Sequence, residues 1–264
     1  MNIYFRELKA NLKSLITWSV IIFLMVMVAV SKFASFEGSP ELLALLDSMP
    51  KAMIDAFSMR SFNLTTISSF LGLMSIYFYL MGAMAGALWG SDIISKEERD
   101  KTVEFSLVLP VSRSRVVTAK ALAALTYCIT FVLITWGTTL VATRTYQPGQ
   151  DFYDYLTLSM LALFLVELVF LSIGLFLGCA LKRYKRSGQI AIAVILVTYF
   201  MSVAIELQDK LDFLKYVTPF KYFDPAILYT TGKLEGIYLA LSALIIVVCV
   251  VAGYWIYNKR DLYI

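Results

Sequence analysis

Few side chains in this chain could do chemistry, because its 264 residues include no histidine. That absence excludes histidine metal sites, histidine general bases and Ser-His-Asp triads. The three cysteines, Cys128, Cys179 and Cys249, all fall inside apolar runs, where a cysteine ordinarily packs. The sequence contains neither a G-x-x-x-x-G-K-[ST] phosphate loop nor an H-E-x-x-H motif. We therefore expect no metal site and no enzymatic activity in this chain by itself.

One ionisable side chain, Glu167, lies inside an apolar run. A charge in the middle of a membrane is costly, so such a residue is a candidate for function, here as part of a translocation pathway. Gly174 and Gly178 follow it on the same helix face and have the spacing of a small-residue packing motif. A glutamate that only joins two helices explains the pattern equally well.

Three further glycines, Gly82, Gly86 and Gly90, repeat at intervals of four residues in another apolar run. Such a face lets a second helix approach closely. Packing within the subunit is the simplest interpretation. A dimer contact or a movable helix interface are the alternatives.

The elements that carry these residues are predicted to be membrane-spanning helices. The chain is 59% hydrophobic and 16% charged, with a mean hydropathy of +0.75, whereas soluble proteins carry about 25% charged residues. The apolar residues form six long runs, each near the ~20 residues that a spanning helix needs. We predict an all-α membrane protein with one transmembrane domain over residues 1–264 and spans at about 14–31, 67–90, 121–143, 156–181, 187–205 and 236–258.

The distribution of basic residues predicts the orientation. Of the 23 lysines and arginines, 15 lie in the two termini and in the loops that follow the second and fourth spans. Short cytoplasmic loops carry such an excess. Both termini are therefore expected in the cytoplasm. The bacterial family that the chain resembles, described below, implies a bacterial plasma (inner) membrane.

Short helices are predicted outside the spans. At the amino end, apolar side chains gather on one side of a helical wheel and basic ones on another, which is typical of a helix lying in the membrane interface; the apolar set is Tyr4, Phe5, Leu8, Leu12 and Leu15. On the outer side, Ser39-Pro40 and Pro50 predict a small helical hairpin. The aromatic segment 213–225 is predicted to dip into the bilayer and return.

The most informative loop lies between the second and third spans, over residues 92–120. Ser95 and Glu98 have the spacing of a capping box, Thr102 can cap a short helix that Pro110 ends, and Ser112 or Ser114 can cap the next helix. A short helix with mixed charge and an apolar strip is typical of a docking element for a soluble partner.

This loop resembles that of the permease subunits of bacterial type-2 ATP-binding-cassette (ABC) transporters of the exporter type. Their pattern is glutamate, Gly-Thr, apolar residues, proline, a small residue, arginine, and a lysine that begins the third span; Lys101 replaces the glycine here. The matching residues are Glu97 or Glu98, Thr102, Glu104, Leu107, Leu109, Pro110, Ser112, Arg113 and Lys120. The order of the spans, the Thr218-Pro219-Phe220 segment and the terminal Lys259-Arg260-Asp261 resemble the same family.

The resemblance implies a function and partners. A coupling helix in the loop would dock on a separate nucleotide-binding subunit, which would bind ATP and magnesium, and the coupling residues would be Glu97, Glu98, Thr102, Glu104, Leu107, Leu109, Pro110 and Arg113. A second permease subunit would complete the pathway, as a homodimer or a heterodimer in membrane lipid. The implied activity is export of an amphipathic drug, antibiotic, peptide or lipid. A non-transporting signalling or structural partner of an ATPase is the alternative, and an intramembrane enzyme is a weaker one.

Overall fold

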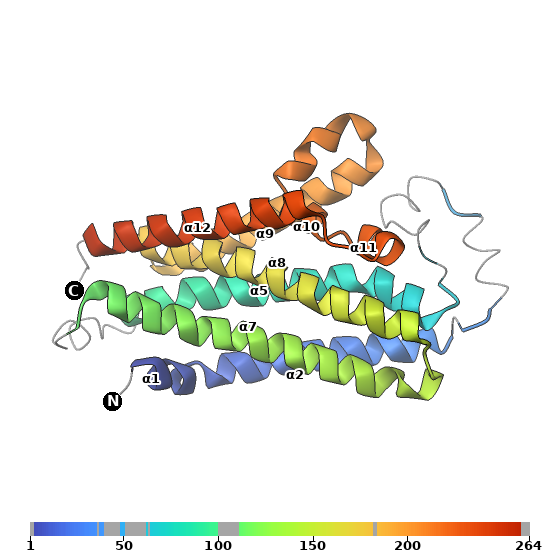
Figure 1. Ribbon diagram of the computed structural model, residues 1–264. Coiled ribbons are helices and arrows are strands. Elements are labelled where there is room, and N and C mark those ends of the chain that lie inside the picture. The colour runs from blue at the N-terminus through green and yellow to red at the C-terminus, as the bar shows by residue number, and fades with distance from the viewer. Residues whose placement is uncertain are drawn as a thin grey trace.

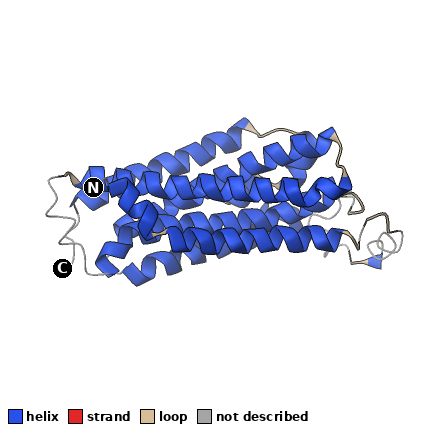
Figure 2. Cartoon of the chain, turned by 90° about the horizontal axis from the view of Figure 1, so that it is seen from below, coloured by secondary structure: helices blue, strands red, loops and turns tan. Residues whose placement is uncertain are grey.

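A computed structural model describes residues 3–35, 37–39, 48–50, 62, 64–99, 111–181 and 184–259. Within these ranges the regular structure is helical, without strands (Figure 2). Six of the described helices are long and apolar enough to cross a membrane. They are α2 (Leu12–Phe33), α5 (Ile67–Arg99), α7 (Arg113–Thr143), α8 (Gln150–Ala180), α9 (Tyr184–Leu207) and α12 (Gly236–Lys259).

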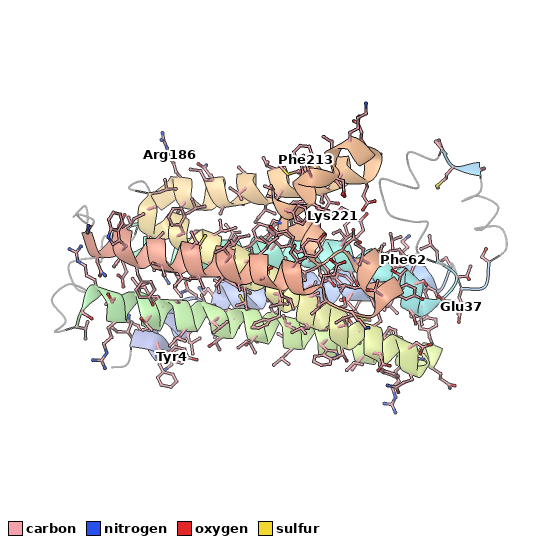
Figure 3. All side chains as sticks on the ribbon, turned by 45° about the horizontal axis from the view of Figure 1, so that its top comes forward. Tyr4, Glu37, Phe62, Arg186, Phe213 and Lys221 are labelled. Atoms are coloured by element: carbon pink, nitrogen blue, oxygen red, sulfur yellow. The ribbon has the colours of Figure 1, made fainter. Side chains whose placement is uncertain are left out.

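The long helices form one elongated bundle, and both ends of the chain lie at the same end of it (Figure 1). We call this the termini end, and the opposite one the far end. Tyr4 and Arg186 lie toward the termini end, and Glu37 and Phe62 toward the far end (Figure 3). An even number of spans requires both termini on one side, so this arrangement agrees with the six predicted spans.

The central pair of the bundle is α5 and α8, whose apolar stretches are mostly buried, whereas those of α2, α9 and α12 are mostly exposed. A helix that is apolar all round and lies at the edge of a bundle is typical of a membrane protein, because lipid covers its outer face. The predicted fold class is therefore confirmed.

The helices that carry the second and third predicted spans extend beyond them at the termini end. Helix α5 continues past residue 90 to Arg99, and α7 begins at Arg113 and not at 121. The predicted capping box is wrong, since Ser95 lies inside α5, where its hydroxyl donates to the Ser91 carbonyl at 2.8 Å. The prediction that Ser112 caps the next helix is confirmed, because its hydroxyl accepts a hydrogen bond from the Arg115 N–H.

The amino end forms the predicted short helix, α1 (Ile3–Ala10). Phe5, on the apolar side that is predicted to face the membrane, is exposed at 59%, and the position of the helix in the membrane interface stays a prediction. Glu7 is buried, at 3%. A basic partner on α7 compensates the burial of this carboxylate, as described below.

The segment before α12 folds back against the long helices. It consists of the 3₁₀ helix η3 (Asp209–Tyr216), α10 (Pro219–Tyr222) and α11 (Pro225–Thr231). The Phe220 ring packs on Phe170, past the midpoint of α8, at 5.3 Å between ring centroids, and on Tyr199 of α9 at 5.6 Å. Phe220 therefore reaches into the bundle, whereas Phe213, Tyr216 and Val217 are exposed. That residues 213–225 dip into the bilayer stays a prediction. The predicted outer hairpin at Pro40 and Pro50 lies largely outside the described residues.

Candidate functional site

The termini end contains a cluster of four charged side chains, three of them buried and the fourth, Arg6, 33% exposed. Lys120 of α7 is 1% exposed, and its Nζ lies 3.3 Å from Glu97 Oε1 of α5 and 3.6 Å from Glu7 Oε1 of α1. The same Nζ donates to the Ile93 carbonyl at 2.7 Å. Arg6 donates to Glu97 at 2.8 Å and to Glu7 at 3.1 Å. This four-charge cluster (Arg6, Glu7, Glu97 and Lys120) holds two positive and two negative charges and joins three helices.

The balance of these charges matters because they are buried. An ion removed from water loses several kcal/mol of hydration free energy, which only close partners and further hydrogen bonds repay. Each member of the cluster lies within 3.6 Å of an opposite charge. Removing one member leaves a buried net charge, so the cluster fixes the relative positions of α1, α5 and α7.

Further hydrogen bonds hold α1 in place. The Tyr127 hydroxyl of α7 donates to the Leu8 carbonyl at 2.7 Å. Lys96 of α5 donates to the Ala10 carbonyl at 3.2 Å and to Asn11 Oδ1 at 3.1 Å. A lysine at the last carbonyls of a helix satisfies acceptors that have no partner within the helix. Helix α1 is therefore fixed to both α5 and α7.

The start of α7 is also joined to the end of α12. Arg113 donates to the Tyr257 carbonyl at 3.4 Å. The Asn258 amide donates to the Ser114 hydroxyl at 2.9 Å, and the Thr118 and Tyr254 hydroxyls lie 2.7 Å apart. The predicted coupling residue Arg113 therefore ties α7 to α12.

The predicted coupling helix falls between two anchored helix ends. Helix α5 ends at Arg99 and α7 begins at Arg113, and both ends belong to the network above. Thr102, Glu104, Leu107, Leu109 and Pro110 lie outside the described residues. Glu97 is a member of the four-charge cluster, and Glu98 is half-buried beside it in α5. Their role in coupling stays a prediction.

Arg6 and Glu7 were not predicted from the sequence as members of a charge cluster with Glu97 and Lys120. A signal was available, because Tyr4, Glu7, Leu8, Asn11 and Leu15 follow the i, i+3, i+4, i+7 pattern of one helix face. Glu7 on that face indicates a buried acid that needs a basic partner. The identity of the partner depends on the packing of α1 on α7.

The five glycines singled out in the sequence lie at the contact between α5 and α8. A Cβ at Gly174 would lie 2.1 Å from the Ala87 carbonyl oxygen, and one at Gly90 would lie 2.3 Å from that of Leu171. For Gly86 and Gly178 the nearest atoms are the carbonyl oxygens of Glu167 and Ser91, at 2.8 Å each, and for Gly82 it is a Leu163 side-chain atom at 2.6 Å. Only glycine permits this backbone approach.

Glu167 lies in the same contact. It is 0% exposed, and a Cβ at Gly82 would lie 3.3 Å from its Oε1. Neither carboxyl oxygen has a hydrogen-bond partner among the described residues. A buried group of this kind is costly and calls for an explanation. Its predicted place in a translocation pathway stays a prediction.

A cavity of about 570 Å³ opens near the termini end, between the start of α2, the last turns of α5 and the start of α9. Trp18 and Trp89 give it aromatic walls, and Ser91, Asp92 and Gln189 give it polar ones. Its volume lies in the range of small-molecule sites, about 300–1,000 Å³. This combination of walls suits a ligand that is partly apolar and partly polar.

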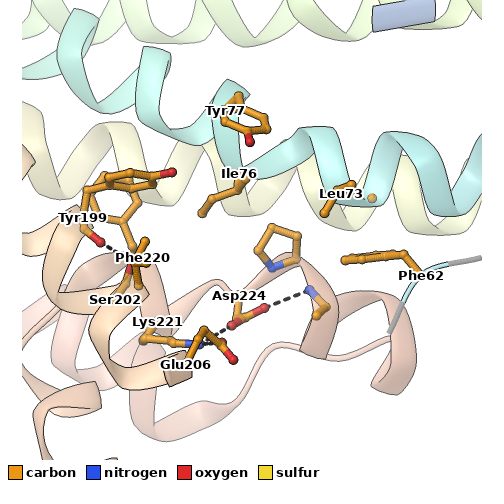
Figure 4. Close-up of a pocket in the computed structure, with 14 residues that line it drawn as sticks. Phe62, Leu73, Ile76, Tyr77, Tyr199, Ser202, Glu206, Phe220, Lys221 and Asp224 are labelled. Carbon is orange, nitrogen blue, oxygen red and sulfur yellow. Dashed lines mark hydrogen bonds and ion pairs between the residues drawn. The ribbon is translucent and has the colours of Figure 1, made fainter. Parts of the chain in front are cut away.

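The far end has a charged cluster of its own (Figure 4). Lys221 of α10 bonds to Glu206 of α9 and, at 2.7 Å, to Asp224, which caps α11 by accepting the Ala226 N–H at 2.9 Å. The Thr218 hydroxyl donates to the Thr198 carbonyl of α9 at 2.8 Å. These bonds hold the segment 218–226 against α9.

Comparison with known proteins gives one match. A family model described as "ABC-2 family transporter protein" matches residues 1–262. None of the curated proteins compared with the chain matches it. The match covers almost the whole chain, including both the four-charge cluster and the anchored helix ends.

Proposed function

This chain belongs to the ABC-2 transporter family and is a multi-pass membrane protein, and from that premise we propose that it is the permease subunit of an ABC exporter. A separate nucleotide-binding subunit binds ATP and Mg²⁺ and hydrolyses the nucleotide. Two permease subunits, identical or different, form the pathway. The termini end faces the cytoplasm of a bacterial cell.

The observation that carries this proposal is the anchoring on both sides of residues 100–110. A docked subunit that moves this segment pulls on the end of α5 and on the start of α7. The four-charge cluster transmits the displacement to α1. The hydrogen bonds from Arg113 to the Tyr257 carbonyl and from Asn258 to the Ser114 hydroxyl transmit it to α12. Helix α5 is in turn locked to α8 by the glycine contacts. Movement of one docking element would therefore displace α1, α5, α7, α8 and α12.

The cavity at the termini end supports an amphipathic substrate. It lies beside the anchored end of α5, and both indole and carboxylate side chains line it. A compound with an apolar body and a polar group satisfies both kinds of wall. Movement of α5 relative to α2 changes the shape of this cavity, which connects docking to substrate passage.

Reconstitution tests the function directly. The chain, purified through an affinity tag attached after α12, is expected to retain an ATPase subunit that mass spectrometry identifies. Inside-out proteoliposomes of the complex are expected to accumulate an amphipathic fluorescent dye with ATP but not with a non-hydrolysable analogue. Hydrolysis without movement of any tested dye would favour the signalling alternative, and the absence of an ATPase subunit would refute the proposal.

A further inference from the structure

A groove runs along α7 at the termini end, on the outside of the bundle. Its lining comes from one face of α7 and from Tyr4 of α1. The residues of α7 are Ser114, Arg115, Thr118, Ala119, Leu122, Leu125, Thr126 and Ile129. Their spacing follows successive turns of the helix, so the groove runs lengthwise and not around it.

The groove changes character along its length. Its first turns carry Ser114, Arg115 and Thr118, whereas its later turns carry Leu122, Leu125 and Ile129. The uncharged run of α7 begins at residue 121. With a rise of about 1.5 Å per residue, Arg115 lies roughly 10 Å above Leu122 along the helix axis. The polar part therefore lies at the level of the lipid headgroups and the apolar part at the level of the acyl chains.

The polar groups differ in what they already bind. The hydroxyls of Thr118 and Thr126 are engaged with Tyr254 and Tyr4, at 2.7 and 3.0 Å. These bonds join the floor of the groove to α12 and to α1. The Arg115 side chain is exposed, and no hydrogen bond or ion pair to its guanidinium is found within the described residues. The guanidinium therefore places a positive charge at the polar part of the groove.

We propose that this groove is a binding site for an anionic phospholipid, with the phosphate on Arg115 and one acyl chain along Leu122, Leu125 and Ile129. Two features select this occupant. A guanidinium matches a phosphate geometrically and electrostatically, and Leu122 and Ile129 remain 49% and 43% exposed at the depth of the acyl chains, where a lipid chain covers such side chains. A free phosphate ion would leave the apolar part empty.

The site has a consequence for the protein. A lipid in the groove contacts α7 beside the attachment of α1 at Tyr4 and Thr126 and beside that of α12 at Thr118 and Tyr254. It therefore braces the same helix ends that the four-charge cluster holds. Binding of an anionic lipid is expected to stabilise the folded chain by RT ln(1 + [L]/Kd), where [L] is the free lipid concentration.

The test uses the full chain in detergent, with lipid binding measured by native mass spectrometry. Phosphatidylglycerol and phosphatidylcholine of the same acyl composition are the two probes, and glycerol phosphate is the chain-free control. We expect phosphatidylglycerol to bind preferentially, glycerol phosphate not to compete, and Arg115→Gln to lower the phosphatidylglycerol affinity about fivefold, the effect of one basic residue near a membrane surface. Lys13→Gln removes an equal charge at the same end outside the groove and is expected to leave the affinity unchanged.

A second variant separates the apolar part from the charge. Ala119→Leu fills the groove and is expected to weaken both lipids alike. Equal binding of the two lipids by the wild-type chain, or an equal loss in Arg115→Gln and Lys13→Gln, would overturn the proposal. So would competition by glycerol phosphate, which would reveal a phosphate site without a lipid. None of these measurements requires the ATPase subunit, so they are independent of the proposed transport function.

Discussion

Replacing Lys120 with methionine is the sharpest test of the four-charge cluster. Methionine keeps most of the length and the apolar stem of the side chain but removes the charge. In the structure the Lys120 ammonium lies 2.7 Å from the Ile93 carbonyl and 3.3 and 3.6 Å from Glu97 and Glu7, with 1% of the side chain exposed. Without it, Arg6 is the one cation left within the four-charge cluster for two buried carboxylates, and the cluster carries a net charge of −1.

The expected loss of stability follows from that imbalance. Breaking a buried ion pair by removing one partner costs about 3–5 kcal/mol. In the double variant Lys120→Met with Glu7→Gln, one positive and one negative charge remain, Arg6 and Glu97, at 2.8 Å. We expect this second substitution to restore about 1–3 kcal/mol, the usual coupling between groups of one network.

Unfolding in mixed micelles titrated with a denaturing detergent, followed by tryptophan fluorescence, measures both effects. Lys215→Met is the matched control, because Lys215 pairs with Asp212 at the surface, where ion pairs contribute little. A Lys120→Met variant as stable as the wild type would refute the reasoning. So would a double variant less stable than Lys120→Met.

Three further predictions follow from other parts of the chain. Gly174→Ala is expected to lose about 1–3 kcal/mol in the same unfolding assay, because its Cβ meets the Ala87 backbone, whereas Gly137→Ala, with no atom within 4 Å, is expected to be neutral or slightly stabilising. If Glu167 acts in transport, Glu167→Gln is expected to assemble normally and to lose ATP-dependent dye uptake; normal uptake would make it a packing residue. Leu107→Asp with Leu109→Asp is expected to abolish co-purification of the ATPase subunit without affecting membrane insertion, and retention of the subunit would place docking elsewhere.

The spans were predictable because each depends on a local property, an apolar run of about twenty residues. The start of α7 at Arg113 was predictable from the cap at Ser112, whereas the extension of α5 was not, since Glu97 is a charged residue that is typical of a loop until its partners are known. Burial of Lys120 depends on Glu7, which lies far away in the sequence and reaches it only when α1 packs on α7. The glycine spacing predicted that each of the two helices packs closely on another helix. It did not predict that α5 and α8 pack on each other.

The predicted cap of α7 at Ser112 is confirmed and the predicted capping box at Ser95 is wrong, although both predictions depend on the same residue types. Ser112 follows Pro110, which interrupts a helix, so a new helix start is required after it. Ser95 has no such break before it, and its hydroxyl bonds to the preceding turn of a continuous helix. In this chain, a capping residue predicted a helix start where a proline precedes it, and not where no helix-breaking residue does.

The central claim is that motion of the segment 100–110 reaches the spans through the four-charge cluster, and the number of substrate molecules moved per ATP hydrolysed tests it most directly. In proteoliposomes of the full complex, Glu97→Gln is compared with Glu235→Gln, an exposed acid near the start of α12. We predict that Glu97→Gln retains the ATPase subunit and hydrolyses ATP, but moves several-fold fewer dye molecules per ATP than the control. An unchanged ratio in Glu97→Gln, at whatever rate of hydrolysis, would contradict the account.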